Sequence, residues 1–330
     1  MWQGPSEMTV EERPDPGDPG DGELILEPEA VGICGSEIEG YLGHMGNRTP
    51  PLVMGHEFAG RVVAAGSGVA DFEGQRVAVN PLSGCGHCAL CRAGLGNVCP
   101  DRTLIGVHVP GAFADYVRVP AADARVLPDG VSARLGALME PLANGVHAVG
   151  LGGGADVEHA VVLGAGTIGL VTLQAALLTG IPRVEVVEPH DARRERAARL
   201  GAHAVHAAPP RDDLGPDLVL DAVGAQATRS AGLDILRPGG TLVCIGLAAD
   251  DTTLGFHGVV RNQHRIQGSY AYTMADYERA HEWLVTGQAT LGDELTDVLP
   301  LDAGPEQFAR LAQGPPAEFK VFLAGTGREA

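Results

Sequence analysis

The sequence contains little positive charge and almost no lysine. Its 330 residues carry 23 Lys and Arg against 42 Asp and Glu, a formal net charge of −19, and Lys320 is its single lysine. Nucleic acids and anionic membrane surfaces favour clustered basic side chains, which release counterions on binding. We therefore expect neither nucleic acid nor a membrane surface as a partner.

The sequence also lacks a recognisable secretion signal. Its first twenty residues, MWQGPSEMTVEERPDPGDPG, show no basic region followed by an apolar run. Residues 160–181 carry no charge, which matches a membrane span in length, but glycines interrupt the run and argue against spanning. We expect a cytoplasmic protein.

Cysteine is scarce outside one short stretch. Four of the six cysteines fall within fifteen residues: Cys85, Cys88, Cys91 and Cys99. Disulfide-rich scaffolds are typical of short secreted chains that cannot build an adequate core, whereas this chain has 330 residues and is 45% hydrophobic. A disulfide knot is therefore excluded, and a zinc site or an iron or redox centre remains. Cys244 is expected to pack in a core strand.

The amino-acid composition and the hydrophobic pattern of the chain change between residues 127 and 144. Before it, Gly, Pro and short valine-rich runs predict a small irregular β-barrel with long loops. After it, short buried strands and helices alternate, which predicts a doubly wound parallel sheet. The strands are expected at 161–163, 184–187, 204–206, 218–220 and 241–245, and helices at 191–200, 226–236 and 275–285. Residues 207–216 contain three prolines and predict a trimmed loop in place of one helix.

A glycine-rich segment follows the first strand of that sheet. Residues 162–169 read VLGAGTIG and open a helix, which is the context that a dinucleotide-binding fingerprint requires. Gly164 permits the tight turn, Gly166 lets the backbone approach a pyrophosphate, and Gly169 lets the helix pack on the sheet. The helix N-terminus stabilises the anion. We expect this segment, with Thr167 and Ile168, to bind a dinucleotide.

Glu188 ends the next strand, roughly twenty residues after the glycines. A carboxylate at this point accepts hydrogen bonds from the adenosine ribose of NAD and repels the 2′-phosphate of NADP. We therefore expect NAD. Arg193, which we place in the cofactor site, and Arg194 lie close enough in sequence to keep NADP open as an alternative.

The first region carries other metal-binding residue types. Cys34 lies in VGICGS, and His56 and Glu57 lie in the glycine-framed segment GHEFAG. A thiolate, an imidazole and a carboxylate that meet at one ion suit zinc.

These motifs and their order resemble those of the zinc-dependent medium-chain alcohol dehydrogenases, nearest to the branch of sorbitol, threonine and butanediol dehydrogenases. The resemblance covers nearly the whole sequence. It implies an α/β protein with a GroES-like catalytic domain, an irregular β-barrel formed by residues 1–143 and 272–330. It also implies a Rossmann domain, residues 144–271, with a doubly wound parallel sheet that binds the cofactor.

The resemblance further implies two Zn²⁺ per chain. The cysteine lobe, residues 85–99, would hold a structural zinc through Cys85, Cys88, Cys91 and Cys99, in a closed tetrahedral site with no position for a substrate.

A catalytic zinc would be bound by Cys34, His56 and either Glu57 or Glu140, because members of the family differ in the third ligand. Glu140 lies in a segment similar to that of polyol dehydrogenases, where ethanol-type relatives have cysteine. An open zinc site favours the alkoxide of a bound alcohol, whose carbon then releases hydride to NAD. Ser36 occupies the family's position for relaying the alcohol proton.

Two departures from the family concern the relay and the substrate. Many relatives continue the relay with a histidine where this sequence has Glu39. Polyol dehydrogenases carry Arg-Tyr where this sequence has Ala271 and Tyr272. We expect a small-molecule substrate, a secondary alcohol in a polyol, sugar, cyclitol or diol, or the matching ketone. Tyr41, Phe113 and Tyr272 are the expected pocket walls.

Other classes of function fit the sequence less well. One alternative is an NADP-dependent alcohol or aldehyde reductase of the same superfamily. A zinc-free quinone reductase would need neither Cys34 nor His56. A zinc-ribbon binding protein would need a basic face near the cysteine lobe, where the nearby basic residues are Arg92 and Arg102. The relatives are dimers or tetramers, so a homodimer or homotetramer is expected.

Overall fold

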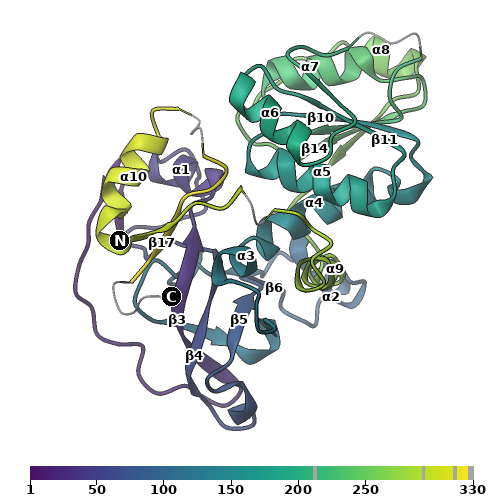
Figure 1. Cartoon of the computed structure of the whole chain (residues 1–330). Helices are drawn as coiled ribbons and strands as arrows, with labels where there is room; N and C mark the ends of the chain where they lie inside the picture. Colours follow the sequence, from purple (N-terminus) through teal and green to yellow (C-terminus); the bar gives the residue numbers. More distant parts are fainter. Residues whose placement is uncertain (211–213, 292–293, 315–317, 326–330) are drawn as a thin grey trace. The chain divides into compact units, whose positions relative to one another are not determined.

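The structure, a computed structural model, describes residues 1–210, 214–291, 294–314 and 318–325. It divides into two compact units (Figure 1). The first unit comprises Met1–Glu140 and Gly292–Ala330, and the second comprises Pro141–Leu291. The chain re-enters the first unit at residue 292, later than the expected 272.

Contacts within the second unit explain the later boundary. Helix α9, Met274–Val285, begins with a capping box at Thr273, and its Asp276 lies 2.8 Å from Nδ1 of His147. Beyond the helix, Thr290 donates its backbone N–H to the side chain of Gln174 at 3.0 Å. These polar contacts hold residues 273–290 on the second unit, although the family resemblance implied that the other domain resumes at residue 272.

The second unit is a six-stranded parallel sheet in the order β12-β11-β10-β13-β14-β15. The first strand in sequence, β10, lies in the middle, so the strand order reverses beside it, as in other doubly wound sheets. Five strands match the predicted ones, and β15, a short fully exposed strand, was not predicted. Their bounds are β10 His159–Leu163, β11 Arg183–Val187, β12 Ala204–His206, β13 Leu218–Asp221, β14 Thr241–Cys244 and β15 Arg265–Gly268.

Helices connect most of these strands. They are α5 Thr167–Thr179, α6 Asp191–Arg199, α7 Gln226–Ile235 and α8 Phe256–Arg261, and α4, Met139–Leu151, precedes the first strand. The uncharged run 160–181 is divided between β10, a glycine turn and α5, and no helix in the described ranges is long and apolar enough to cross a membrane. The connection from β12 to β13 contains no helix in its described parts, and residues 211–213 lie outside them.

The first unit is built on an irregular sheet in the order β16-β17-β3-β4-β5-β9, with β8 also paired to β3. The C-terminal strand β17 pairs antiparallel with β3 and closes the unit. The main strands are β3 Glu23–Gly32, β4 Glu57–Ala65, β5 Arg76–Val79, β8 Val117–Pro120, β9 Ala124–Val126, β16 Val298–Pro300 and β17 Phe322–Ala324.

Shorter elements surround this sheet. The helices are α1 Gly35–Tyr41, α2 Ala89–Arg92, α3 Ala133–Ala137 and α10 Gly304–Leu311, and the short strands are β1 Trp2–Gly4, β2 Glu7–Met8, β6 Leu82–Ser83 and β7 Thr103–Leu104.

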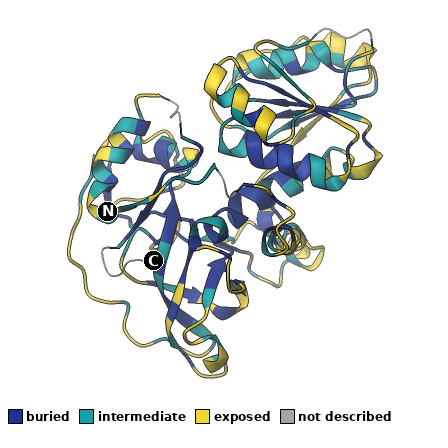
Figure 2. Ribbon diagram, in the orientation of Figure 1, coloured by how far each residue is buried: buried dark blue, intermediate teal, exposed yellow. Residues whose placement is uncertain are grey.

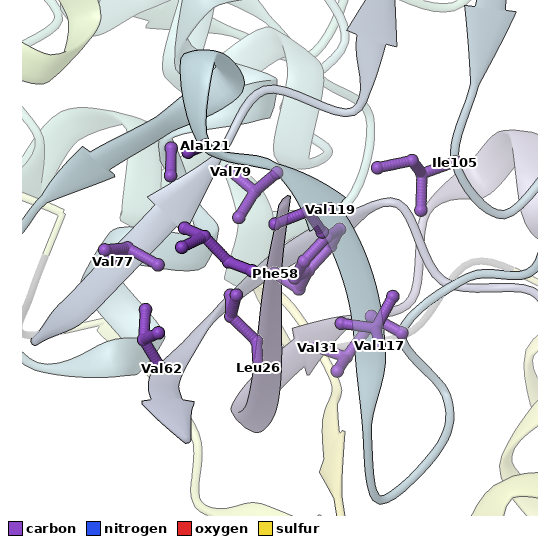
Figure 3. Close-up of a cluster of buried hydrophobic side chains, with 13 residues drawn as sticks. Leu26, Val31, Phe58, Val62, Val77, Val79, Ile105, Val117, Val119 and Ala121 are labelled. Atoms are coloured by element: carbon purple, nitrogen blue, oxygen red, sulfur yellow. The ribbon is translucent and has the colours of Figure 1, made fainter. Parts of the chain in front are cut away.

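Apolar side chains from neighbouring strands fill the interior of the first unit. Leu26, Phe58, Val77 and Val119 are at most 1% exposed and pack in one cluster (Figure 3). Figure 2 shows the strands of both units largely in the colour of buried residues. Burial of this kind contributes about 25 cal/mol per Å² of apolar surface. The result is a rigid base for the segments that follow β3 and precede β4.

Candidate functional site

Strand pairing brings the first candidate metal ligands together. Gly32 at the end of β3 is in register with Glu57 at the start of β4, so Cys34 just after one strand lies beside His56 just before the other. A Cβ at Gly32 would lie 2.5 Å from Oε2 of Glu57. A larger residue at that position would have to displace the buried carboxylate of Glu57.

One ligand atom from each of Cys34, His56 and Glu57 lies within 4.8 Å of the other two. His56 and Glu57 are 5% and 1% exposed. Neither carboxylate oxygen of Glu57 takes part in an aligned hydrogen bond within the described chain. A thiolate, an imidazole and a carboxylate in one place suit zinc, so the residues fit such an ion. We name this group the open cluster.

Glu37 orients His56 and the backbone around the open cluster. The sequence did not predict this role. Glu37 is fully buried, lies 3.0 Å from Nδ1 of His56, and accepts backbone hydrogen bonds from Cys34 at 3.1 Å and Gly55 at 2.7 Å. Burial opposes both charges, yet the pKa of Glu37 is lowered and that of His56 is raised because each faces the other. A carboxylate on Nδ1 leaves Nε2 of the imidazole for a metal.

Lys320 is the second functional residue that the sequence reasoning missed. Its Nζ lies 2.5 Å from Oε2 of Glu57, as an ion pair without hydrogen-bond alignment, and donates to the carbonyl of Ile33 at 3.2 Å. Burial lowers the pKa of this lysine, but the combined attraction of Glu57, Cys34 and Glu37 outweighs burial and the pKa is raised. The single lysine of the chain therefore remains charged and fixes Glu57. Its rarity in the composition was the available signal.

Ser36 and Glu140 occupy different places relative to the open cluster. The hydroxyl of Ser36 donates to Sγ of Cys34 at 3.3 Å. Glu140 lies in the first turn of α4 and is 9% exposed. Among the described residues, the carboxylate grouped with Cys34 and His56 is that of Glu57, not Glu140.

The four lobe cysteines form a separate group in the first unit. Their ligand atoms lie within 4.8 Å of one another, with Sγ–Sγ distances of 3.9 Å for Cys85–Cys91 and 3.8 Å for Cys88–Cys99. Sulfurs bound to one tetrahedral zinc at about 2.3 Å are separated by about 3.8 Å, whereas a disulfide bond is about 2.05 Å long. All four thiols are free. This geometry fits a zinc ion and excludes a disulfide.

Backbone N–H groups also point at the lobe sulfurs. Cys88 accepts from the N–H of Cys91 at 3.4 Å, and Cys99 accepts from that of Cys85 at 3.4 Å. The first bond lowers the pKa of Cys88 to about 7, while burial, helped by the neighbouring thiols, raises the pKa of Cys91 to about 12. Four adjacent thiols cannot all ionise without a cation between them.

The glycine-rich segment adopts the expected strand–turn–helix arrangement. Strand β10 ends at Leu163, and α5 begins at Thr167 with Gly166 as its N-cap. A Cβ at Gly169 would lie 1.9 Å from the carbonyl oxygen of Gly164, so only glycine allows this close packing. The N-terminus of a helix at this point suits a phosphate, because its backbone N–H groups and dipole attract an anion.

Glu188 lies at the same edge of the sheet and is 3% exposed. Its carboxylate accepts hydrogen bonds from the backbone of Ala165 and of His190, both at 2.9 Å. A carboxylate has about four acceptor sites, so both oxygens still have capacity for a ribose hydroxyl. Burial lowers the pKa of the neighbouring Arg193, and Arg194 donates to the backbone carbonyl of Glu188 at 2.8 Å.

Comparisons with known proteins agree with this geometry. The family model "Alcohol dehydrogenase GroES-like domain" matches residues 20–129, and "Zinc-binding dehydrogenase" matches residues 167–286. The chain is 33% identical to L-galactonate-5-dehydrogenase of Escherichia coli K12 over 324 residues, which cover 94% of each chain. It is 30% identical to sorbitol dehydrogenase of Bacillus subtilis 168, with 93% of this chain and 91% of the relative covered.

Solved structures extend the same likeness to three dimensions. A zinc-binding dehydrogenase from Sinorhizobium meliloti 1021, bound to NADP, superimposes with a TM-score of 0.85 at 31% identity, with 93% of each chain covered. The chain belongs to the zinc-dependent medium-chain alcohol dehydrogenases. As a member of that family it is a zinc-binding oxidoreductase that interconverts alcohols and carbonyl compounds with a nicotinamide cofactor.

The three aromatic residues expected as pocket walls pack against other aromatic rings of their own units. Tyr41 is 6% exposed, and its ring, like that of Phe113, contacts Phe308 edge-on at 5.7 Å. Tyr272 is 2% exposed and stacks on Tyr277. Phe113 lines a cavity of about 160 Å³ whose walls include none of the open-cluster residues. Tyr41 and Tyr272 are buried within their own units and Phe113 is partly buried, and a role for the three as walls of a substrate pocket stays a prediction.

Proposed function

We propose that this dehydrogenase oxidises a secondary hydroxyl of a polyol, sugar acid, cyclitol or diol with NAD, using one structural and one catalytic zinc per chain. The observation that carries the proposal is the pair of clusters in the first unit. Among the described residues, the metal-binding group of the lobe consists of four thiols, whereas the open cluster offers three different ligand types, one of them the buried carboxylate of Glu57. A closed site serves folding, and an open one leaves a position for a substrate.

Two features support the preference for a polyhydroxylated substrate. One is the names of the relatives, and the other is Glu140, which lies in a segment similar to that of polyol dehydrogenases. The names of the relatives refer to L-galactonate and sorbitol, both of which carry secondary hydroxyls. Ala271 replaces the arginine of polyol dehydrogenases, so we place the substrate among these compounds without assigning it to sorbitol.

The residues of the chain divide the chemistry between them. Zinc would be held by Cys34, His56 and either Glu57 or Glu140, where it supplies a Lewis acid for the substrate oxygen, while the nicotinamide supplies the hydride acceptor. Glu37 fixes the tautomer of His56 through Nδ1, and Lys320 holds one oxygen of Glu57. Ser36, already hydrogen-bonded to Cys34, is placed to take the alcohol proton.

NAD preference is proposed on the basis of Glu188. The buried carboxylate cannot move away from a 2′-phosphate, because Ala165 and His190 hold both oxygens. The relative bound to NADP keeps the alternative cofactor open as an outcome of the test. We expect Glu188→Ala to reduce the ratio of kcat/KM with NAD to that with NADP by roughly tenfold, the effect of about 1.4 kcal/mol. A wild-type preference for NADP would contradict this assignment.

A homodimer or homotetramer is also proposed. All four residues of the edge strand β15 are exposed, and Ile266, Phe256 and Val260 expose 39%, 62% and 71% of their surface in the same unit. Unpaired edge strands with apolar neighbours are typical association surfaces. Sedimentation should therefore show an oligomer, and a strictly monomeric protein would contradict the proposal.

The central test is a screen of NADH formation across polyols, sugar acids, cyclitols and diols, with elemental analysis of the same preparation. We expect turnover with at least one class and two zinc ions per chain. Simple primary alcohols serve as the control substrates. Active enzyme with one zinc or none, or better turnover of primary alcohols, would overturn the proposal.

A further inference from the structure

A cavity of about 240 Å³ lies within the second unit, between helices α7 and α8 (Figure 1). Both helices connect neighbouring strands of the parallel sheet in the same direction, β13 to β14 and β14 to β15, so they lie on the same side of that sheet. Its described walls include no residue of the open cluster, the lobe or the glycine-rich segment. A water molecule accounts for about 30 Å³ of liquid water, so the cavity has room for a small organic molecule.

Helix α8 presents a wall with little side-chain bulk to this cavity. The lining residues Gly255, Gly258, Val259 and Asn262 are spaced as i, i+3, i+4 and i+7, which is one face of a helix. A Cβ at either glycine would meet no atom within 4 Å. Gly258 lies inside α8, where glycine costs about 0.5–1 kcal/mol relative to alanine, so helix stability does not account for it. The two glycines keep the cavity open on this side.

Polar side chains line the cavity from three elements. Asp234 lies on α7, Asn262 ends α8, and His264 follows it. Nε2 of His264 is buried and has no hydrogen-bond partner within the described chain. The side chains of Asp234 and Asn262 take part in no hydrogen bond or ion pair with other described residues. Because buried polar atoms in native proteins nearly always have a partner, His264 at this cavity points to a bound molecule.

The charge and chemistry of the walls restrict what that molecule can be. Asp234 is the one acidic side chain among the described walls, which contain no Lys or Arg, so an anion is repelled. A carboxylate accepts hydrogen bonds from two hydroxyls at once, while an amide and an imidazole each donate and accept. Leu233 and Leu254 add aliphatic surface for the C–H groups of a carbon chain.

We propose that this cavity binds a small neutral polyol at a second, non-catalytic site. Two neighbouring hydroxyls of the polyol donate to the carboxylate of Asp234, and Asn262 and His264 bind further hydroxyls. The bound molecule links α8, none of whose residues is buried, to α7. The proposal rests on the walls of the cavity alone and does not depend on which alcohol the enzyme oxidises.

Gly258→Leu tests the site by filling the cavity from α8. The leucine side chain enters open space and replaces a glycine that weakens the helix, so the melting temperature should equal or exceed that of the wild type. Phe256 and Val260 are each two residues from Gly258, about 200° around the helix, so the exposed apolar surface proposed for association is unchanged. The matched control is Gly150→Leu, at an exposed glycine of α4 where a Cβ also meets no atom within 4 Å.

Binding is measured by hydrogen exchange and mass spectrometry on the zinc-loaded enzyme saturated with NADH, which prevents oxidation of the probe. Xylitol is the probe. We expect it to slow exchange at residues 254–264 in the wild type and in Gly150→Leu, and to have at least tenfold less effect in Gly258→Leu. A general solvent effect of xylitol would slow exchange equally in all three proteins and would overturn the proposal.

Asp234→Asn and a charged analogue test the ligand class. Asp234→Asn keeps the shape of the side chain and should weaken xylitol binding roughly tenfold, because hydrogen bonds to a charged group are lost. Xylonate, the matching sugar acid, should bind more weakly than xylitol in the wild type. Tighter binding of xylonate, or protection by butylammonium without protection by xylitol, would overturn the polyol assignment.

Turnover separates this site from the proposed function. Gly258→Leu should oxidise the best alcohol at the wild-type rate, because Gly258 belongs to neither metal cluster nor the glycine-rich segment. Loss of xylitol protection with normal turnover is the expected result. A wild-type enzyme that is protected by xylitol but oxidises no alcohol would support the cavity site and contradict the proposed function.

Discussion

The two metal-binding clusters of the first unit are built in opposite ways. The lobe takes all of its sulfurs from residues 85–99 and is held by N–H···S bonds within that stretch. The open cluster takes Cys34 from the end of β3, His56 and Glu57 from the start of β4, and Lys320 from the C-terminal segment. A local cluster needs a cation to order itself, whereas the open cluster is ordered by the sheet and its buried ion pairs.

This contrast predicts that the largest effect on folding comes from the lobe. Cys91→Ser removes one of four thiolates, and zinc binding in closed thiolate sites is worth about 10–16 kcal/mol in small peptides. We expect a sharp fall in soluble yield and melting temperature, with cleavage by added protease between residues 84 and 99. Normal stability with one zinc per chain would contradict a structural role for the lobe.

Cys34→Ser should affect chemistry rather than order. The sheet still positions the neighbouring residues, so melting temperature, oligomeric state and NADH binding should remain close to wild type. Loss of a Lewis acid worth several kcal/mol corresponds to a decrease of roughly 10³-fold or more in turnover. Near-normal turnover on the best substrate would refute the assigned mechanism. Cys91→Ser is the matched comparison, because it makes the same cysteine-to-serine change in the other cluster.

Lys320→Met tests whether a buried ion pair orders the open cluster. Removal of one partner leaves Glu57 buried without its counter-charge, which typically costs about 3–5 kcal/mol of unfolding free energy. Denaturant unfolding of the native protein measures this loss. Lys320→Arg, which keeps the charge, is the control and should retain most of the stability. Equal stability of the Met and Arg variants would show that the pair is not required.

Glu37→Gln should have the smallest effect of the four changes. A glutamine offers one acceptor oxygen where Glu37 now accepts from Gly55 and Cys34 and faces His56. Loss of such a supporting contact costs about 10–100-fold in metal affinity. Competition with a chelator should release the open-cluster zinc first in this variant and leave the lobe zinc in place. Simultaneous loss of both ions would contradict the independence of the two clusters.

Local patterns predicted most of the second unit. Helices α6, α7 and α9 begin and end within one residue of the predicted ranges, because charge, capping and periodicity act over a few residues. Strand β15 was missed, since the sequence RIQG at a sheet edge carries no hydrophobic pattern. The domain boundary at residue 292 was missed as well, because it depends on contacts such as His147–Asp276 between distant parts of the chain.

The sequence by itself determined the residue types and spacings that chemistry requires: the four lobe cysteines, the glycine fingerprint and the Cys34 and His56 segments. These signals are readable because each is confined to a short stretch whose local geometry is nearly independent of the rest. Only the tertiary structure brought a carboxylate oxygen of Glu57 within 4.8 Å of the ligand atoms of Cys34 and His56, and placed Lys320 and Glu37 against them. Those contacts link positions up to 287 residues apart through strand register and burial. Neither strand register nor burial can be predicted from a short stretch of sequence.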